Sequence, residues 1–122
     1  MKILKLALLA VLVVPSLAGT APPTDLFTPI LNVAGNMLVC NVVNASDNVV
    51  AGTLGMWNSD GMPVTATHIP FNLAPGHGAV VAANSGFDGY CKITIAAKAE
   101  AVRANLCVMK LGEGCIATAD AR

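Results

Sequence analysis

Charged and aromatic residues are both scarce in this sequence. Only 11% of its 122 residues are Asp, Glu, Lys or Arg, and no run of like charge occurs. Phe, Trp and Tyr together make up 4% of the chain. A protein that binds nucleic acid through its phosphates needs a basic patch or stripe, and the sequence has none. The composition therefore predicts no nucleic-acid partner.

The sequence also lacks an apolar run long enough to cross a membrane. The run Leu6–Val14 has nine residues, whereas a membrane-spanning helix needs about 20. Lys2 and Lys5 precede this run, and the small residues Ser16 and Ala18 follow it. Basic residues, a short apolar core and small residues, in that order, are typical of a secretory signal peptide.

We therefore expect residues 1–18 to be a signal peptide that is cleaved after Ala18. Cleavage after Ala21 and an uncleaved membrane anchor are the alternatives. Seven basic and seven acidic residues balance in the whole chain, and removing Lys2 and Lys5 leaves five against seven, a net charge of −2. The mature protein is expected to be secreted or periplasmic, with no stable membrane span after cleavage.

Metal-binding cysteine motifs are missing as well. The chain has four cysteines but no C-x-x-C pair and no His beside a Cys, the arrangements usual in zinc sites. An even cysteine count in a short exported chain indicates disulfides. We expect two disulfides, no bound metal and no cofactor; the cysteines are Cys40, Cys91, Cys107 and Cys115.

Turn signals that combine Gly, Asn, Asp or Pro recur at short intervals, at 44–48, 58–61, 74–78, 84–89 and 112–114. Between them lie runs rich in Val, Ile, Thr and Leu: Met37–Val43, Val49–Trp57, Pro63–Ile69, Ala79–Ala83, Tyr90–Ala96, Val102–Met109 and Ile116–Thr118. Seven or eight short strands at this spacing predict an all-β sandwich or barrel, and we favour a small antiparallel sandwich over residues 37–122. The Ala-rich window Ala96–Ala104 is the one place where a helical turn is expected.

Residues 19–36 form an N-terminal arm rich in Pro and Thr. The arm carries apolar side chains, Leu26 and Phe27 among them, that are costly to leave in water. Pro29 lacks an amide hydrogen and so suits an edge strand. We expect the arm to pack along a sheet edge of its own domain, with the sheet of a neighbouring subunit as the alternative.

The alternation of side chains along a strand predicts which cysteines face the core. Cys91 shares a face with Ile93 and Ile95, and Cys40 shares a face with Leu38. Both cysteines are therefore expected to point into the interior.

Cys107 has the opposite phase. It shares a face with the polar Asn105, so we expect it on the outside of its strand, at one end of a hairpin that closes at Cys115. Of the three possible connectivities, Cys40–Cys91 with Cys107–Cys115 is the one that joins cysteines of like burial. We predict this pairing.

A long-range disulfide of this kind resembles that of the immunoglobulin-like sandwich. That fold joins its two sheets by a disulfide, packs a Trp near it and places a Tyr before the second Cys. The counterparts here are Cys40, Trp57, Tyr90 and Cys91. Tyr90 directly precedes Cys91, whereas the Tyr of that fold stands two residues before, and Trp57 is out of phase with the apolar Met56. The resemblance implies the architecture and no function.

The signal peptide, the stretches "LAPGHG" and "VRANLC", and the closing Ala-Arg also resemble a group of small exported bacterial proteins with two disulfides and no assigned activity.

Catalytic motifs are not evident. His68, in a predicted strand, and His77, in the turn "PGHG", give at most a two-ligand hint of a surface metal site. Ser85 stands in a turn sequence rather than a nucleophile elbow. The acidic residues stand mostly in turns, where Asp and Gly serve the backbone. We expect the protein not to be an enzyme.

The sequence thus predicts an exported, non-catalytic structural or interaction module of the cell envelope or exterior. One alternative is a ligand-binding module for a glycan or a surface metal, which an exposed aromatic row or converging His68 and His77 would favour. Most aromatic side chains are, however, expected in the core. The other alternative is a subunit of a surface assembly, which an unpaired, uncharged edge strand would favour. The partner is an unknown protein or a second copy of the chain.

Overall fold

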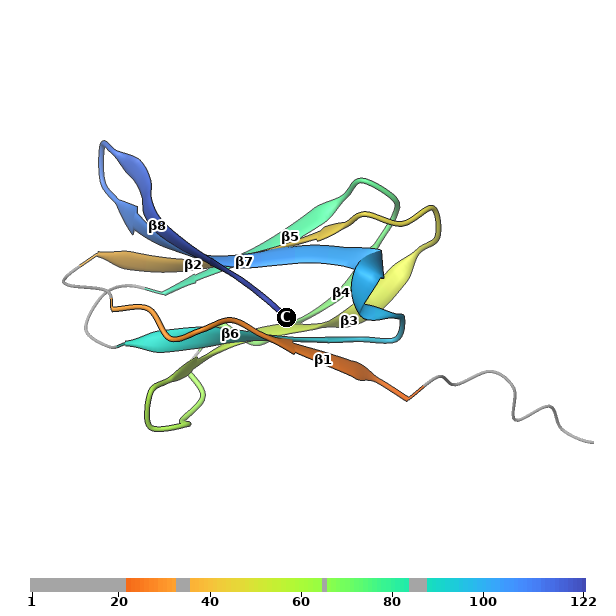
Figure 1. The fold of residues 1–122 in the computed structure, drawn as a ribbon, viewed down its shortest axis with the longest axis horizontal. Helices are drawn as coiled ribbons and strands as arrows, with labels where there is room; N and C mark the ends of the chain where they lie inside the picture. Colours follow the sequence, from red (N-terminus) through yellow and green to blue (C-terminus); the bar gives the residue numbers. More distant parts are fainter. Residues whose placement is uncertain (1–21, 33–35, 65, 84–87) are drawn as a thin grey trace, which may run out of the picture.

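Two antiparallel sheets of four strands make up the molecule (Figure 1). The computed structural model describes residues 22–32, 36–64, 66–83 and 88–122, so the predicted signal peptide and most of the predicted turn at 84–89 lie outside the described residues. The strands are β1 (Thr24–Phe27), β2 (Met37–Asn44), β3 (Val50–Asn58), β4 (Ile69–Leu73), β5 (Gly78–Ala83), β6 (Gly89–Ile95), β7 (Val102–Lys110) and β8 (Gly114–Asp120). The predicted all-β sandwich is confirmed.

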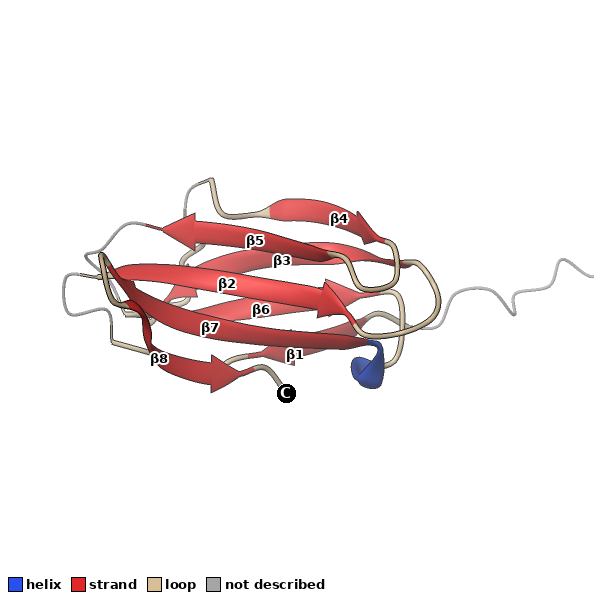
Figure 2. Ribbon diagram, turned by 90° about the horizontal axis from the view of Figure 1, so that it is seen from above, coloured by secondary structure: helices blue, strands red, loops and turns tan. Residues whose placement is uncertain are grey.

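The first sheet has the strand order β1-β6-β3-β4, and the second has the order β5-β2-β7-β8. Figure 1 shows them as two layers, and Figure 2 shows the strands of each layer lying side by side. The part of the chain that the structure describes contains no helix long and apolar enough to cross a membrane. A single 3-10 turn among the described residues, η1 (Ala99–Ala101), falls in the window where a helical turn was expected.

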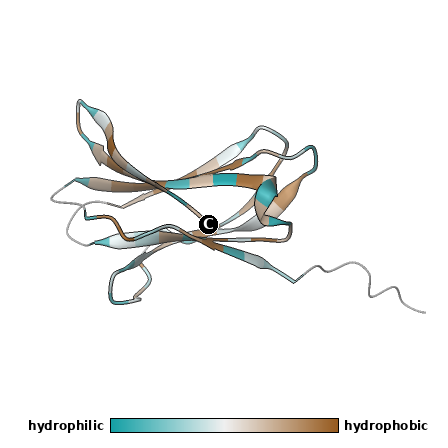
Figure 3. Cartoon of the chain, viewed as in Figure 1, coloured by the Kyte–Doolittle hydropathy of each residue, from teal (hydrophilic) through white to brown (hydrophobic). Residues whose placement is uncertain are grey.

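The core fills the space between the sheets with aliphatic side chains, Met56 and one disulfide. Inward-facing residues alternate with outward-facing ones, so that Cys91, Ile93 and Ile95 of β6 are fully buried while the residues between them are half-exposed. Apolar residues accordingly lie mostly within the strands, and the turn after β3 is hydrophilic (Figure 3). None of the aromatic residues that the structure describes belongs to the fully buried core.

The N-terminal arm packs on the edge of its own domain. β1 pairs with β6, and Leu26 is buried between the sheets. On its other side β1 meets the end of the chain, where Phe27 and Arg122 exchange two backbone hydrogen bonds, of 3.1 and 3.0 Å. One side of the sandwich is thereby closed.

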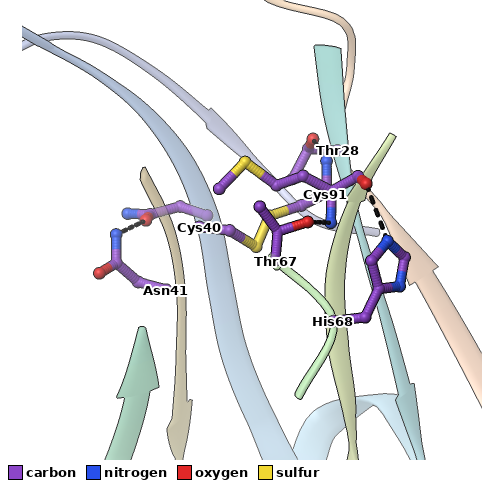
Figure 4. Close-up of a disulfide and its surroundings, with 8 residues drawn as sticks. Thr28, Cys40, Asn41, Thr67, His68 and Cys91 are labelled. Carbon is purple, nitrogen blue, oxygen red and sulfur yellow. Dashed lines mark hydrogen bonds between the residues drawn. A yellow bond between two sulfur atoms is a disulfide. The ribbon is translucent and has the colours of Figure 1, made fainter. Parts of the chain in front are cut away.

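The disulfides have the pairing that strand phase predicts. Cys40 of β2 and Cys91 of β6 join the two sheets, and both are completely buried (Figure 4). Cys107 and Cys115 staple the β7–β8 hairpin. Two disulfides favour an oxidising, extracytoplasmic environment.

The premise of like burial is wrong for the second bridge. Cys107 lies opposite Val39 on the outer face of its sheet, as its phase predicts, yet only 3% of its surface is exposed. Cys115 is exposed. Cys107 lies on β7, an interior strand flanked by β2 and β8, whereas Cys115 lies on β8 at the sheet edge. Strand position, in addition to phase, decides burial here.

The predicted strand at Pro63–Ile69 is also wrong, because β4 begins where that prediction ends. Only an isolated bridge joins Pro63 to Trp57. Thr67 is buried, and its hydroxyl donates to the Val64 carbonyl at 2.8 Å and accepts from the Met56 amide at 3.2 Å. Side-chain hydrogen bonds of this kind compete with strand pairing and fold the segment back on itself.

Candidate ligand-binding face

A row of ring side chains crosses the outer face of the first sheet. Phe27 comes from β1, Tyr90 from β6 and Trp57 from β3, while His68 immediately precedes β4. The ring centroids of Phe27 and Tyr90 are 6.4 Å apart, those of Tyr90 and Trp57 are 6.2 Å apart, and those of Trp57 and His68 are 4.2 Å apart. The row therefore runs across all four strand positions of this sheet.

Strand alternation turns these rings away from the core. Trp57 and Tyr90 lie directly opposite each other on adjacent strands, and their ring planes are within 15° of parallel. Their neighbours Met56 and Cys91 face inward and are completely buried. Trp57 and Tyr90 are half-buried, whereas Phe27 is 46% exposed. The rings thus offer apolar surface to solvent in a pattern that the backbone fixes.

Lys92 lies between two members of the row. Its ammonium nitrogen is 5.7 Å from the Phe27 ring centroid and 5.6 Å from the Trp57 ring centroid. A cation at this distance from an aromatic face is attracted by the ring quadrupole, and exposed contacts of this kind contribute about 0.5–1 kcal/mol. Lys92 therefore contributes a weak attraction to both rings and adds a hydrogen-bond donor to the face.

A glycine makes room for the histidine ring. A Cβ atom on Gly55 would lie 2.5 Å from Nδ1 of His68 and 3.0 Å from the Trp57 ring, so no larger residue fits without displacing them. The Nε2–H of His68 donates to the Met56 carbonyl oxygen at 3.1 Å (Figure 4). This bond and the open surface of Gly55 fix the imidazole edge-on to Trp57.

A shallow hollow of about 290 Å³ opens beside the indole of Trp57. It is lined by Trp57 and His68 together with Thr53, Leu54, Gly55, Ile69, Pro70, Lys92 and Thr94. The Thr94 hydroxyl donates to a carboxylate oxygen of Asp25 at 2.6 Å, which places an acceptor next to the hollow. The hollow therefore combines an aromatic wall with hydroxyl and ammonium groups, and a carboxylate lies beside it.

A larger hollow of about 690 Å³ lies where β1 meets the end of the chain. Its lining combines four charged residues, two asparagines and six apolar residues: Arg103, Arg122, Glu100, Asp120, Asn41, Asn105, Leu26, Val43, Val102, Ala99, Ala104 and Ala121. Its lining contains no aromatic ring. The larger hollow therefore has an apolar lining but no ring on which a flat ligand could stack.

The two histidines do not converge. His68 precedes the first residue of β4, and His77 follows its last residue across a turn, where the His77 carbonyl accepts from the Asn44 amide. A five-residue strand spans roughly 16 Å, so the rings stand at opposite ends of β4. Over the described residues no group of three or more His, Cys, Asp and Glu side chains could hold a metal ion.

The expectation that most aromatic residues serve the core is wrong for three of them, Phe27, Trp57 and Tyr90. The alternation of side chains along the strands could have predicted that Trp57 and Tyr90 face outward. Trp57 alternates with buried Met56, and Tyr90 alternates with Cys91, so the phase that buries the cysteine also turns Tyr90 outward. What phase could not give is that β1, β6 and β3 are neighbours, which places all three rings on one face.

No family model, curated protein or solved structure matches the chain.

Proposed function

We propose that the protein is an exported, non-catalytic binding module of the cell exterior that takes its ligand on the outer face of its first sheet. The observation that carries this proposal is the row of rings at Phe27, Tyr90, Trp57 and His68. Three of the five Phe, Trp and Tyr residues in the chain lie on this one face. Exposed aromatic surface next to convergent polar groups is characteristic of a binding site.

Export is supported by the two disulfides and by the signal-peptide pattern at residues 1–18. The resemblance to immunoglobulin-like sandwiches is supported by the disulfide that joins the two sheets. Two details depart from that fold. Trp57 and Tyr90 face outward, and the N-terminal β1 occupies the place beside β6 where that fold puts its last strand. The proposal therefore rests on the aromatic face and not on that resemblance.

Membership of a surface assembly is the second candidate. β5 is an edge strand without a charged residue or proline, and Val80 on it is 58% exposed. Strands of this kind can pair with another chain. A chain that paired with β5 would extend the second sheet and leave the outer face of the first sheet open. The two functions are therefore compatible.

The proposal is tested by retention on the insoluble material of the cell exterior. Mature protein is mixed with washed, protein-free exterior material from its own host and sedimented. We expect wild type to sediment with the material and Trp57→Ala/Tyr90→Ala to lose at least tenfold in affinity. Val80→Ala/Ile116→Ala, which removes exposed apolar side chains from the second sheet, is the matched control and should bind as wild type does. Equal retention of all three proteins would refute the aromatic face as the binding surface.

A further inference from the structure

We propose that the ligand of this face is a neutral glycan, with one sugar ring seated in the hollow beside Trp57. The inference rests on the proposed binding function and names its ligand class. It follows from three properties of the face: the aromatic wall, the polar groups around it and their balance of charge.

The aromatic wall suits one side of a sugar ring. A pyranose presents a flat surface of C–H groups, and the face of an aromatic ring carries partial negative charge, so the polarised C–H groups are attracted to it. Trp57 has the largest ring in the row and lines the hollow directly. Tyr90 lies beside it with a nearly parallel ring, 6.2 Å away. A second sugar unit can therefore contact the row next to the first.

The polar groups suit the rim of a sugar. Hydroxyl groups both donate and accept hydrogen bonds, and the hollow supplies both kinds of partner. Thr53 and Thr94 line it with hydroxyls, and Lys92 adds a donor. Asp25 accepts from Thr94 through one carboxylate oxygen and retains acceptor capacity on the other. Ligand hydroxyls around a stacked ring therefore find partners without burying an unpaired group.

The charges favour a neutral ligand. Lys92 lines the hollow, and the Asp25 carboxylate lies beside it through its bond to Thr94. One cation and one anion at the same site leave no net charge to attract an acidic polysaccharide or nucleic acid. The mature chain, with its expected net charge of −2, adds no long-range attraction for anions.

A proline-rich peptide is the competing occupant, because aromatic grooves also bind polyproline helices. Such a peptide has few side-chain hydrogen-bonding groups and would offer no side-chain partner to the Thr53 hydroxyl, the Lys92 ammonium group or the second carboxylate oxygen of Asp25. Two threonine hydroxyls, an ammonium group and a carboxylate around one ring are better matched by a polyhydroxylated ligand.

Trp57 provides the readout, since it is the only Trp in the chain. Mature protein is titrated with cellohexaose, xylohexaose, laminarihexaose and chitohexaose while its intrinsic fluorescence is recorded. Hexagalacturonate is the acidic arm, and a ten-residue proline peptide is the peptide arm. We expect at least one neutral hexasaccharide to shift the fluorescence saturably, with a dissociation constant below about 1 mM, a binding free energy of about −4 kcal/mol.

Variants then locate the site. Thr94→Val and Lys92→Met should each weaken neutral-glycan binding at least fivefold, and Trp57→Ala should abolish it in calorimetry. Val80→Thr, on the opposite sheet, should bind as wild type does, and unfolding curves check that each variant is folded. Binding that is unchanged in Thr94→Val and Lys92→Met would contradict the proposed seat of the sugar.

The outcomes separate this inference from the function on which it rests. If no neutral hexasaccharide binds while retention on exterior material still depends on Trp57 and Tyr90, the glycan assignment is wrong and the binding face stands. Tighter binding of hexagalacturonate or of the proline peptide than of every neutral glycan also overturns the assignment. If retention does not depend on the face, the proposed function itself fails.

Discussion

A single hydroxyl completes the hydrogen bonding next to the bridge between the sheets. The backbone N–H of Cys91 donates to the Thr28 hydroxyl at 2.9 Å, and the Thr28 amide donates to the Cys91 carbonyl at 3.0 Å. Figure 4 shows both residues beside Cys40. Thr28 follows the last residue of β1, so its side chain continues the pairing with β6 beyond the end of the strand.

Replacing Thr28 with Val should destabilise the protein by about 1–3 kcal/mol, because the isosteric side chain leaves the buried Cys91 amide without an acceptor. Thr28→Ser keeps the hydroxyl and should cost much less. The free energy of unfolding from urea titration of both variants gives the comparison. A loss in Thr28→Ser, which keeps the hydroxyl, as large as that in Thr28→Val would contradict this role of the hydrogen bond.

Strand alternation makes residues predictable where a strand is correctly placed. It predicted that Cys91 faces inward and that Cys107 faces outward. The same alternation implies that the side chains of Trp57 and Tyr90 point outward. It failed to give the burial of Cys107, because burial also depends on which strands lie alongside.

β1 and β4 show what can be predicted at the level of the element. Pro29 and the apolar residues of the arm indicated an edge strand, and β1 lies at the edge of the first sheet. The predicted strand Pro63–Ile69 shares only Ile69 with β4. Pro70 is tolerated there since β4 is also an edge strand. The bend before β4 depends on the hydrogen bond from the Met56 amide to the Thr67 hydroxyl, and no local sequence pattern predicts this bond between residues 11 positions apart.

Deleting residues 19–31 removes β1 and should lower the free energy of unfolding by about 3 kcal/mol or more. The buried Leu26 side chain alone accounts for roughly 1.5–3 kcal/mol, and the pairing with β6 is lost as well. Deleting only residues 19–22, which precede β1, is the control and should cost little. Urea unfolding of dilute protein makes the measurement.

If the monomer that lacks residues 19–31 unfolds with the same free energy as wild type, β1 adds nothing to the stability of its own domain. In that case the arm would be free to serve a neighbouring molecule.

The two disulfides act on different scales of the whole molecule. Cys40–Cys91 closes a separation of 51 residues and joins the sheets, whereas Cys107–Cys115 closes a separation of eight within one hairpin. In the chain-entropy description these loops correspond to about 4 and roughly 2.5 kcal/mol. The architecture was predictable because turn spacing and cysteine count constrain a small chain with two disulfides strongly. The neighbours of each strand were not, since pairing order depends on contacts far apart in sequence.

Cys40→Ala/Cys91→Ala should therefore lose more stability than Cys107→Ala/Cys115→Ala. The difference should exceed the entropic one, because Cys40 and Cys91 are both fully buried and their replacement leaves a cavity in the core. Thermal unfolding of the two double variants, compared with the oxidised wild type, decides it. A larger loss for the hairpin pair would contradict the view that the bridge between the sheets dominates.

Phe27 and Asp25 belong to the edge strand β1, while Trp57, Tyr90 and Lys92 belong to β3 and β6 inside the sheet. A ligand that contacts Phe27 or Asp25 binds fully only when β1 is docked on β6. Occupancy and docking are then thermodynamically linked, so a ligand that gains affinity from β1 must by the same factor suppress its opening. Amide hydrogen exchange of residues 24–27 would therefore slow when ligand is added. A molecule that displaces β1 from the edge of β6 would inhibit ligand binding without contacting the ligand site.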